Sequence, residues 1–283
     1  DKYSLVYQFS ARKFYDQALT TPADSLSNFN RKIVNPYKAG LGLVYLQDFI
    51  GGDTLVNSLK EFYSKNQLKL SNSNDFKEIL TKNTSKNLEW FFNDYIKTSK
   101  KIDYKISEIK NKKHSDSLEI TIKNKRNFSS PIALYGIKDK EIQFKKWING
   151  TKSSKVVKIK KGYFDKIVLN YENTYPEYNS LDNFRKINNT LLNKPFQFRF
   201  FKDIENPYYN QLFYYPDFKY NLYDGLILGT NINNKSLVKH NFEWSLTPNY
   251  GTKSKKITGS YSFNYNHFFK KSSIYKIRYS FNG

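Results

Sequence analysis

Apolar residues recur at helical spacing through the first third of the chain. The clearest example is the stretch 35–50, where Leu43, Leu46 and Ile50 lie three and four residues apart. This spacing places them on one face of an amphipathic helix. The glycines at 51–52 are expected to end that helix, because glycine readily adopts the backbone conformation found after a helix C-terminus. The pattern therefore predicts a helix over 35–50 that buries these three residues.

Other short helices are expected around this one. Pro36 suits the first turn of a helix, so the helix should begin there. Residues before Ala11 could be extended. Further helices are predicted over 11–19, 54–65, 75–80 and 88–96. Short helices packed on one another are thus expected over residues 1–98.

The periodicity changes from helical to alternating near Lys100. The turn signals between the alternating runs are typical of short antiparallel strands, so a β-sandwich is expected over 99–172. The polar segment 173–194 is expected to be a linker, with a short helix at 181–187. The strands of the sandwich are predicted over 104–109, 118–122, 132–137, 141–148, 155–159 and 166–169.

Longer alternation follows between residues 195 and 283, for example from Val238 through His240 to Leu246. Runs of this length suit tilted strands that cross a bilayer with one apolar face. A soluble antiparallel sheet with one buried face would alternate as well. We favour a partial antiparallel β-barrel, because the runs are long and rich in Tyr, Phe and Trp. The stretch 224–229 with the hairpins after it also resembles the opening strands of outer-membrane surface-antigen barrels.

Composition narrows the function classes. The formal net charge is +22, and six of the 47 basic residues are arginine. Proteins that read nucleic acid favour arginine, so we attribute the lysine surplus to codon usage and expect no nucleic-acid partner. No cysteine is present, which excludes disulfides and thiolate metal sites. Methionine is missing even at position 1, so we expect an internal fragment of a longer protein.

Histidines are too few and too scattered for a metal site. His114 lies in a lysine-rich turn, whereas His240 and His267 lie on strand-like segments. None has a second histidine four residues away, as a zinc-binding helix would require. We therefore assign no metal-ligating and no cofactor-binding residue to this chain.

One motif resembles a known family. Pro36-Tyr37-x-x-Gly40, an apolar helix, two glycines, a second helix and Trp-Phe-Phe-Asn-Asp-Tyr at 90–95 resemble the zinc aminopeptidases of the aminopeptidase N and leukotriene hydrolase (gluzincin) family. The resemblance covers 1–98. It implies that Tyr37 donates a hydrogen bond to the tetrahedral oxyanion. The family has lysine directly before the glycine, whereas here Ala39 takes that place. Spacing alone would make Tyr37 an ordinary packing residue.

The resemblance also implies a whole-protein architecture. We expect an α+β multidomain protein: the α-helical C-terminal part of a gluzincin catalytic domain, an Ig-like or fibronectin-like β-sandwich, and the antiparallel hairpins of a partial barrel. The full-length protein would hold zinc on a helix upstream of this chain and hydrolyse peptide substrates at the N-terminus, and the fragment alone would be inactive. The barrel would place it in the bacterial cell envelope, in the periplasm or outer membrane. A non-catalytic, membrane-anchored scaffold or binding protein is the alternative.

Overall fold

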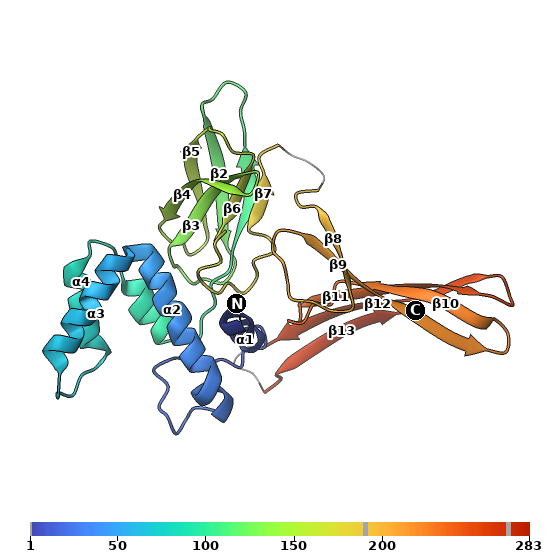
Figure 1. Ribbon diagram of the computed structural model, residues 1–283, viewed down its shortest axis with the longest axis horizontal. Helices are drawn as coiled ribbons and strands as arrows, with labels where there is room; N and C mark the ends of the chain where they lie inside the picture. The colour runs from blue at the N-terminus through green and yellow to red at the C-terminus, as the bar shows by residue number, and fades with distance from the viewer. Residues whose placement is uncertain (1, 189–191, 270–272) are drawn as a thin grey trace. The chain divides into compact units, whose positions relative to one another are not determined.

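The computed structural model describes residues 2–188, 192–269 and 273–283. They separate into two compact units, one formed by residues 2–11 and 15–188 and the other by 12–14 together with the described residues from 192 onward. The structure contains helices as well as three β-sheets (Figure 1). The mixed α+β class predicted from the sequence is therefore confirmed. Among the helices of the described residues, none has the length and apolar character needed to span a bilayer.

Helices fill the first part of unit 1. The predicted helix over 54–65 is confirmed, and it lies beside the next helix with the ring centroids of Phe62 and Phe76 5.4 Å apart (Figure 1). Gly51 separates two helices with a φ of +100°, a conformation that favours glycine. The helices are α1 (Lys2–Ala11), η1 (Asn30–Val34), α2 (Asn35–Ile50), α3 (Gly52–Asn66), α4 (Ser73–Asn83) and η2 (Trp90–Ile96), where η marks a π-helix.

The start of the chain differs from the prediction. Residues 2–11 are helical rather than extended, and the helix predicted over 11–19 is wrong. Helix α1 buries Tyr7 and Ala11 against Val34, and this packing outweighs the weak local pattern. The helix does not continue because Phe14 adopts a φ of +56°, in the left-handed region.

Helix α2 has the predicted bounds, but another helical segment precedes it without a break. The backbone of Val34 is helical, so η1 runs directly into α2 and Pro36 lies inside a longer helix. A proline within a helix removes one backbone hydrogen bond, and a π-helical turn is one way to accommodate that loss. The buried face is also rotated from the prediction, since Leu43 is exposed while Tyr45 and Phe49 are buried.

Two antiparallel sheets complete unit 1. Their strands confirm the six predicted over 99–172, and β7 shows that the helix predicted at 181–187 is wrong. One sheet has the order β1-β2-β5 and the other β4-β3-β6-β7. The strands are β1 (Tyr104–Lys110), β2 (Ser117–Asn124), β3 (Ile132–Lys138), β4 (Glu141–Ile148), β5 (Ser154–Lys160), β6 (Lys166–Leu169) and β7 (Phe184–Lys186).

One hydrophobic core joins the helices and both sheets of unit 1. Tyr45 of α2 is fully buried at its centre. Its ring lies 4.5 Å from Trp90 and 4.2 Å from Tyr175, measured between centroids. Its hydroxyl donates to the backbone carbonyl of Pro131. Tyr175 belongs to the segment predicted to be a polar linker, so part of that segment is packed into the core; residues 189–191 of it lie outside the described residues.

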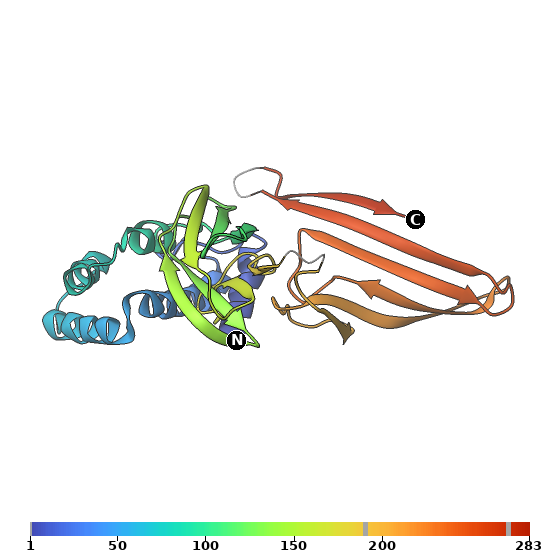
Figure 2. The same cartoon turned by 90° about the horizontal axis from the view of Figure 1, so that it is seen from above.

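Unit 2 contains a single six-stranded sheet with the order β13-β12-β11-β10-β9-β8 (Figure 2). The pairs from β9 to β13 are antiparallel, as predicted, whereas β8 pairs with β9 in parallel. The edge strands β8 and β13 do not pair with each other, so the described residues form no closed barrel. The strands are β8 (Phe196–Phe200), β9 (Asn210–Asn221), β10 (Gly225–Asn233), β11 (Phe242–Gly251), β12 (Ile257–Phe268) and β13 (Lys276–Asn282).

Candidate functional site

Tyr37 lies in the first turn of α2 and is half-buried. Its ring meets the ring of Tyr3 edge-on, with 4.8 Å between centroids and an interplanar angle of 90°. Its hydroxyl makes no hydrogen bond within the described part of the chain. The contact with Tyr3 therefore fixes the ring while the phenolic oxygen stays available.

The side of α2 that carries Tyr37 is open. Gly40 lies one turn further on the same side of the helix, and a Cβ built at Gly40 would meet no described atom within 4 Å. Val44, one more turn along, is exposed. A molecule could thus approach Tyr37 along this side of the helix.

Lys38, the next residue, faces the interior and is almost fully buried. Its Nζ donates to the carbonyl oxygens of Thr98 at 2.9 Å and Gln17 at 3.4 Å. Its own carbonyl oxygen accepts a hydrogen bond from Tyr95 at 2.8 Å. Lys38 therefore anchors the start of α2 and is not free to bind a substrate.

Gly42 brings α2 and η2 into close contact. A Cβ at Gly42 would overlap the ring of Tyr95. Together with the hydrogen bond from Tyr95 to the Lys38 carbonyl, this close approach sets the rotation of α2. The rotation in turn directs Tyr37 and Gly40 away from the core.

A buried ion pair lies in the same part of unit 1. The carboxylate of Asp16 accepts from the Nζ of Lys101, and both side chains are buried. Burial raises the pKa of Tyr7 and of Tyr95 well above the ordinary value, and the charge of Asp16 raises both further. Both phenols stay protonated, so neither can act as a base at neutral pH.

A cleft of about 760 Å³ opens at the other end of α2, beside Phe49 and Trp90. Tyr37 and Phe49 are twelve residues apart on one helix, which corresponds to about 18 Å. The carboxylate of Glu89 in this cleft accepts from Lys77 at 2.8 Å, and this hydrogen bond lowers the pKa of Glu89. The cleft is therefore separate from Tyr37, and this carboxylate is an ionised partner of a lysine rather than a proton carrier.

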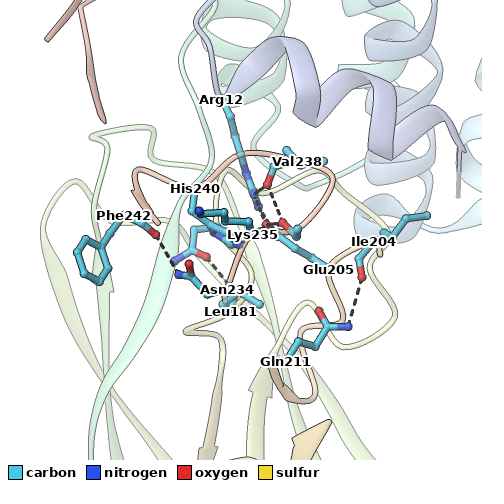
Figure 3. A network of polar contacts seen from close by, with 12 residues as sticks. Arg12, Leu181, Ile204, Glu205, Gln211, Asn234, Lys235, Val238, His240 and Phe242 are labelled. Carbon is cyan, nitrogen blue, oxygen red and sulfur yellow. Dashed lines mark hydrogen bonds and ion pairs between the residues drawn. The ribbon is translucent and has the colours of Figure 1, made fainter. Parts of the chain in front are cut away.

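Unit 2 contains a polar network around Glu205 (Figure 3). Arg12 donates to both carboxylate oxygens of Glu205, with a distance of 2.6 Å between Nη2 and Oε2. The Nε2 of His240 lies 3.0 Å from Oε1, and the hydroxyl of Ser236 lies 3.1 Å from the same oxygen. Ser236 also donates to the carbonyl of Val238. These contacts hold residues 236–240 as a loop, so the predicted strand over Val238 and His240 begins only at Phe242.

The protonation of Glu205 follows from these contacts. Burial alone would raise its pKa, but the hydrogen bonds from Arg12 and His240 outweigh burial and lower the pKa to about 2. A carboxylate held ionised by a bidentate arginine is a structural partner rather than an acid catalyst.

The three histidines are spread as the sequence suggested, with one change. His114 lies in a turn, His267 lies on β12 and His240 lies in the loop before β11. Within residues 2–188, 192–269 and 273–283, no three His, Cys, Asp or Glu side chains gather in a way that could hold a metal ion.

The buried charged pairs could not be predicted from the sequence. Asp16 and Lys101 are 85 residues apart, and Arg12 and Glu205 are 193 residues apart. In the sequence each of these residues is indistinguishable from an ordinary charged surface residue. Partners so far apart in the chain leave no recognisable spacing pattern.

Comparisons with known proteins find similarity to solved structures but no family match. No protein-family model matches the sequence, and no curated protein matches it. Among solved structures, this chain is similar to aminopeptidase A from Legionella pneumophila in complex with aspartic acid, with a TM-score of 0.44 and 15% identity. The similarity covers 52% of this chain and 18% of that protein. This chain thus matches less than a fifth of the Legionella protein's length.

Proposed function

We propose that this chain is part of a zinc-dependent aminopeptidase in which Tyr37 stabilises the oxyanion formed during hydrolysis at a peptide N-terminus. The motif resemblance around Pro36, Tyr37 and Gly40 suggests the role. The observation that carries it is the phenol itself, which is fixed by Tyr3 and has no hydrogen-bond partner among the described residues.

The chemistry requires a donor that is not already engaged. When water adds to a peptide carbonyl, negative charge develops on the carbonyl oxygen. A phenolic O–H donates one hydrogen bond. It stabilises the transition state most when the ring is already in position and the hydroxyl does not have to break a hydrogen bond within the protein first. Tyr37 meets both conditions. The π-helical turn just before α2 also supports a functional role for Tyr37, because such turns are frequent at functional sites.

Zinc is not assigned to any residue of this chain. The described residues offer no group of ligands that fits a zinc ion. In the proposed enzyme the ligands would come from elsewhere in the protein, and Tyr37 is the one contribution assigned to this sequence. Peptide is the proposed substrate class.

The experiment is the Tyr37→Phe variant of the full-length protein, assayed with aminoacyl and peptide substrates. Phenylalanine keeps the ring contact with Tyr3 and removes only the hydroxyl. Loss of one oxyanion donor is expected to lower kcat by about 100- to 1,000-fold, with little change in KM. The Tyr3→Phe variant is the matched control and should keep its activity. An unchanged kcat in Tyr37→Phe would remove Tyr37 from the mechanism.

A further inference from the structure

One face of the sheet in unit 2 is apolar and exposed. The strand register places Leu228 opposite Phe218 and Tyr250, and Leu246 opposite Tyr261. Directly opposite residues point to the same side of a sheet, and each of these five side chains is exposed. We call this the apolar face. It continues through Tyr220, Leu226, Tyr265, Tyr279 and Phe281.

The charged residues of these strands all occupy the intervening positions. Asp217 and Lys219 on β9, Glu243 on β11, and Lys276 and Arg278 on β13 lie on the opposite side. No Asp, Glu, Lys or Arg of the described strands β9 to β13 lies on the apolar face. The apolar face is therefore free of formal charge across five strands.

The opposite side, which we call the polar face, is buried along its centre and exposed on β13. Asn231, Thr247 and Asn264 are each less than 10% exposed. The Nδ2 of Asn231 donates to the hydroxyl of Thr247 at 2.6 Å, and the Oδ1 of Asn264 accepts from Arg278 at 2.7 Å and from Ser280 at 2.8 Å. These side chains therefore form hydrogen bonds with one another, whereas the buried Oδ1 of Asn249 on the same face has no partner among the described residues.

This distribution reverses that of a soluble sheet. A soluble antiparallel sheet covers its apolar face with the core and exposes polar residues to water. Here the central polar residues of β10, β11 and β12 are buried, and the aromatic and aliphatic residues of the apolar face are exposed. Water would be a poor solvent for such a surface, so the surface requires an apolar partner.

We propose that the apolar face contacts the acyl chains of a lipid bilayer. Strands β9 and β12 each contain twelve residues. At about 3.3 Å per residue and a tilt of about 45°, such a strand spans about 28 Å, close to the ~30 Å hydrocarbon core of a bilayer. Lipid suits the face better than a protein partner, because protein interfaces combine their apolar core with a polar rim that fixes orientation. The proposal is independent of the role of Tyr37.

The experiment uses single-cysteine variants, since the native chain has no cysteine. An environment-sensitive dye is attached to Tyr261→Cys on the apolar face or to the adjacent Ser262→Cys on the polar face. The full-length protein is incorporated into vesicles of phosphatidylcholine with plain or brominated acyl chains. Bromine is expected to quench the dye strongly at 261 and weakly at 262. Leu246→Cys and Thr247→Cys should repeat the same alternation.

Zwitterionic lipid is required because a chain of net charge +22 would bind anionic vesicles through charge alone. Equal quenching at 261 and 262 would overturn the proposal. It would also be overturned if the dye at 261 were shielded without lipid and the protein formed a concentration-dependent dimer in sedimentation. That result would assign the face to a second copy of this chain.

Discussion

The buried carboxyl of Glu177 has a pKa far from the ordinary value for glutamate. Its carboxyl is 1% exposed and accepts hydrogen bonds from the backbone N–H of Tyr104 and from the side chain of Asn183. Burial disfavours the ionised form more than these contacts favour it, and the pKa of Glu177 rises to about 8. The folded protein therefore holds a proton here at neutral pH.

This proton makes unfolding pH-dependent. Below about pH 4.5, the ordinary value, both the folded and unfolded states bind the proton and the stabilisation is complete. Between about 4.5 and 8 the unfolded state loses the proton first, so the free energy of unfolding falls as pH rises. Glu177→Gln should reduce this dependence of the unfolding free energy on pH by up to about 1 kcal/mol per pH unit.

The measurement is urea unfolding of both proteins between pH 6.5 and 8, followed by circular dichroism. This range lies above the pKa of Asp103, which burial raises to about 6, so that group adds little. Identical slopes in the variant and the parent would show that Glu177 is ionised in the folded state.

Only those parts of the candidate site that depend on residues close together in the sequence could be predicted. Tyr37 is predicted from Pro36 and Gly40, which lie within three residues of it in the sequence. The burial of Lys38 could not be predicted, because it depends on the carbonyl of Thr98, which lies 60 residues away. Spacing within one helix does not say which of two neighbouring residues faces the core.

Helix α2 is the element on which the account of Tyr37 depends, since its rotation decides where the phenol points. Gly42→Ala tests this, because the added methyl would overlap Tyr95. Overpacking of this kind costs about 1–3 kcal/mol. The variant is therefore expected to unfold at lower urea concentration and to have a lower kcat in the proposed full-length enzyme.

Gly40→Ala is the matched control on the same helix. Its Cβ would meet no described atom within 4 Å, and alanine favours a helix over glycine by up to about 1 kcal/mol. This variant should be as stable as the parent or slightly more so. Equal destabilisation by both substitutions would mean that the close contact with Tyr95 does not set the rotation of α2.

At the scale of elements, periodicity predicted most of the fold. Strands β1 to β6 fall where the sequence pattern placed them. Strands β1, β2 and β5 alternate because each buries one face in the shared core, whereas β3 is buried on both faces. Strand β7 was missed because Phe184–Lys186 is too short to show a period. The parallel pairing of β8 was missed because alternation gives the face of a strand but not the direction of its neighbour.

At the scale of the whole molecule, the proposed reaction uses Tyr37 from this chain and zinc ligands from elsewhere in the protein. Because the proposed zinc ligands lie outside this sequence, the 283-residue chain expressed alone is expected to retain no stoichiometric zinc after dialysis and to hydrolyse no peptide. Elemental analysis and a peptidase assay test this together. One zinc per chain would show that its ligands lie within this sequence.

Affinity for a transition-state mimic tests the central claim most directly. A peptide analogue with a tetrahedral phosphinate carries the negative oxygen that Tyr37 is proposed to contact. In the proposed full-length enzyme, Tyr37→Phe should weaken binding of this analogue by the same factor by which it lowers kcat/KM, about 100-fold or more, while KM stays nearly constant. Unchanged affinity for the analogue in Tyr37→Phe would contradict the account.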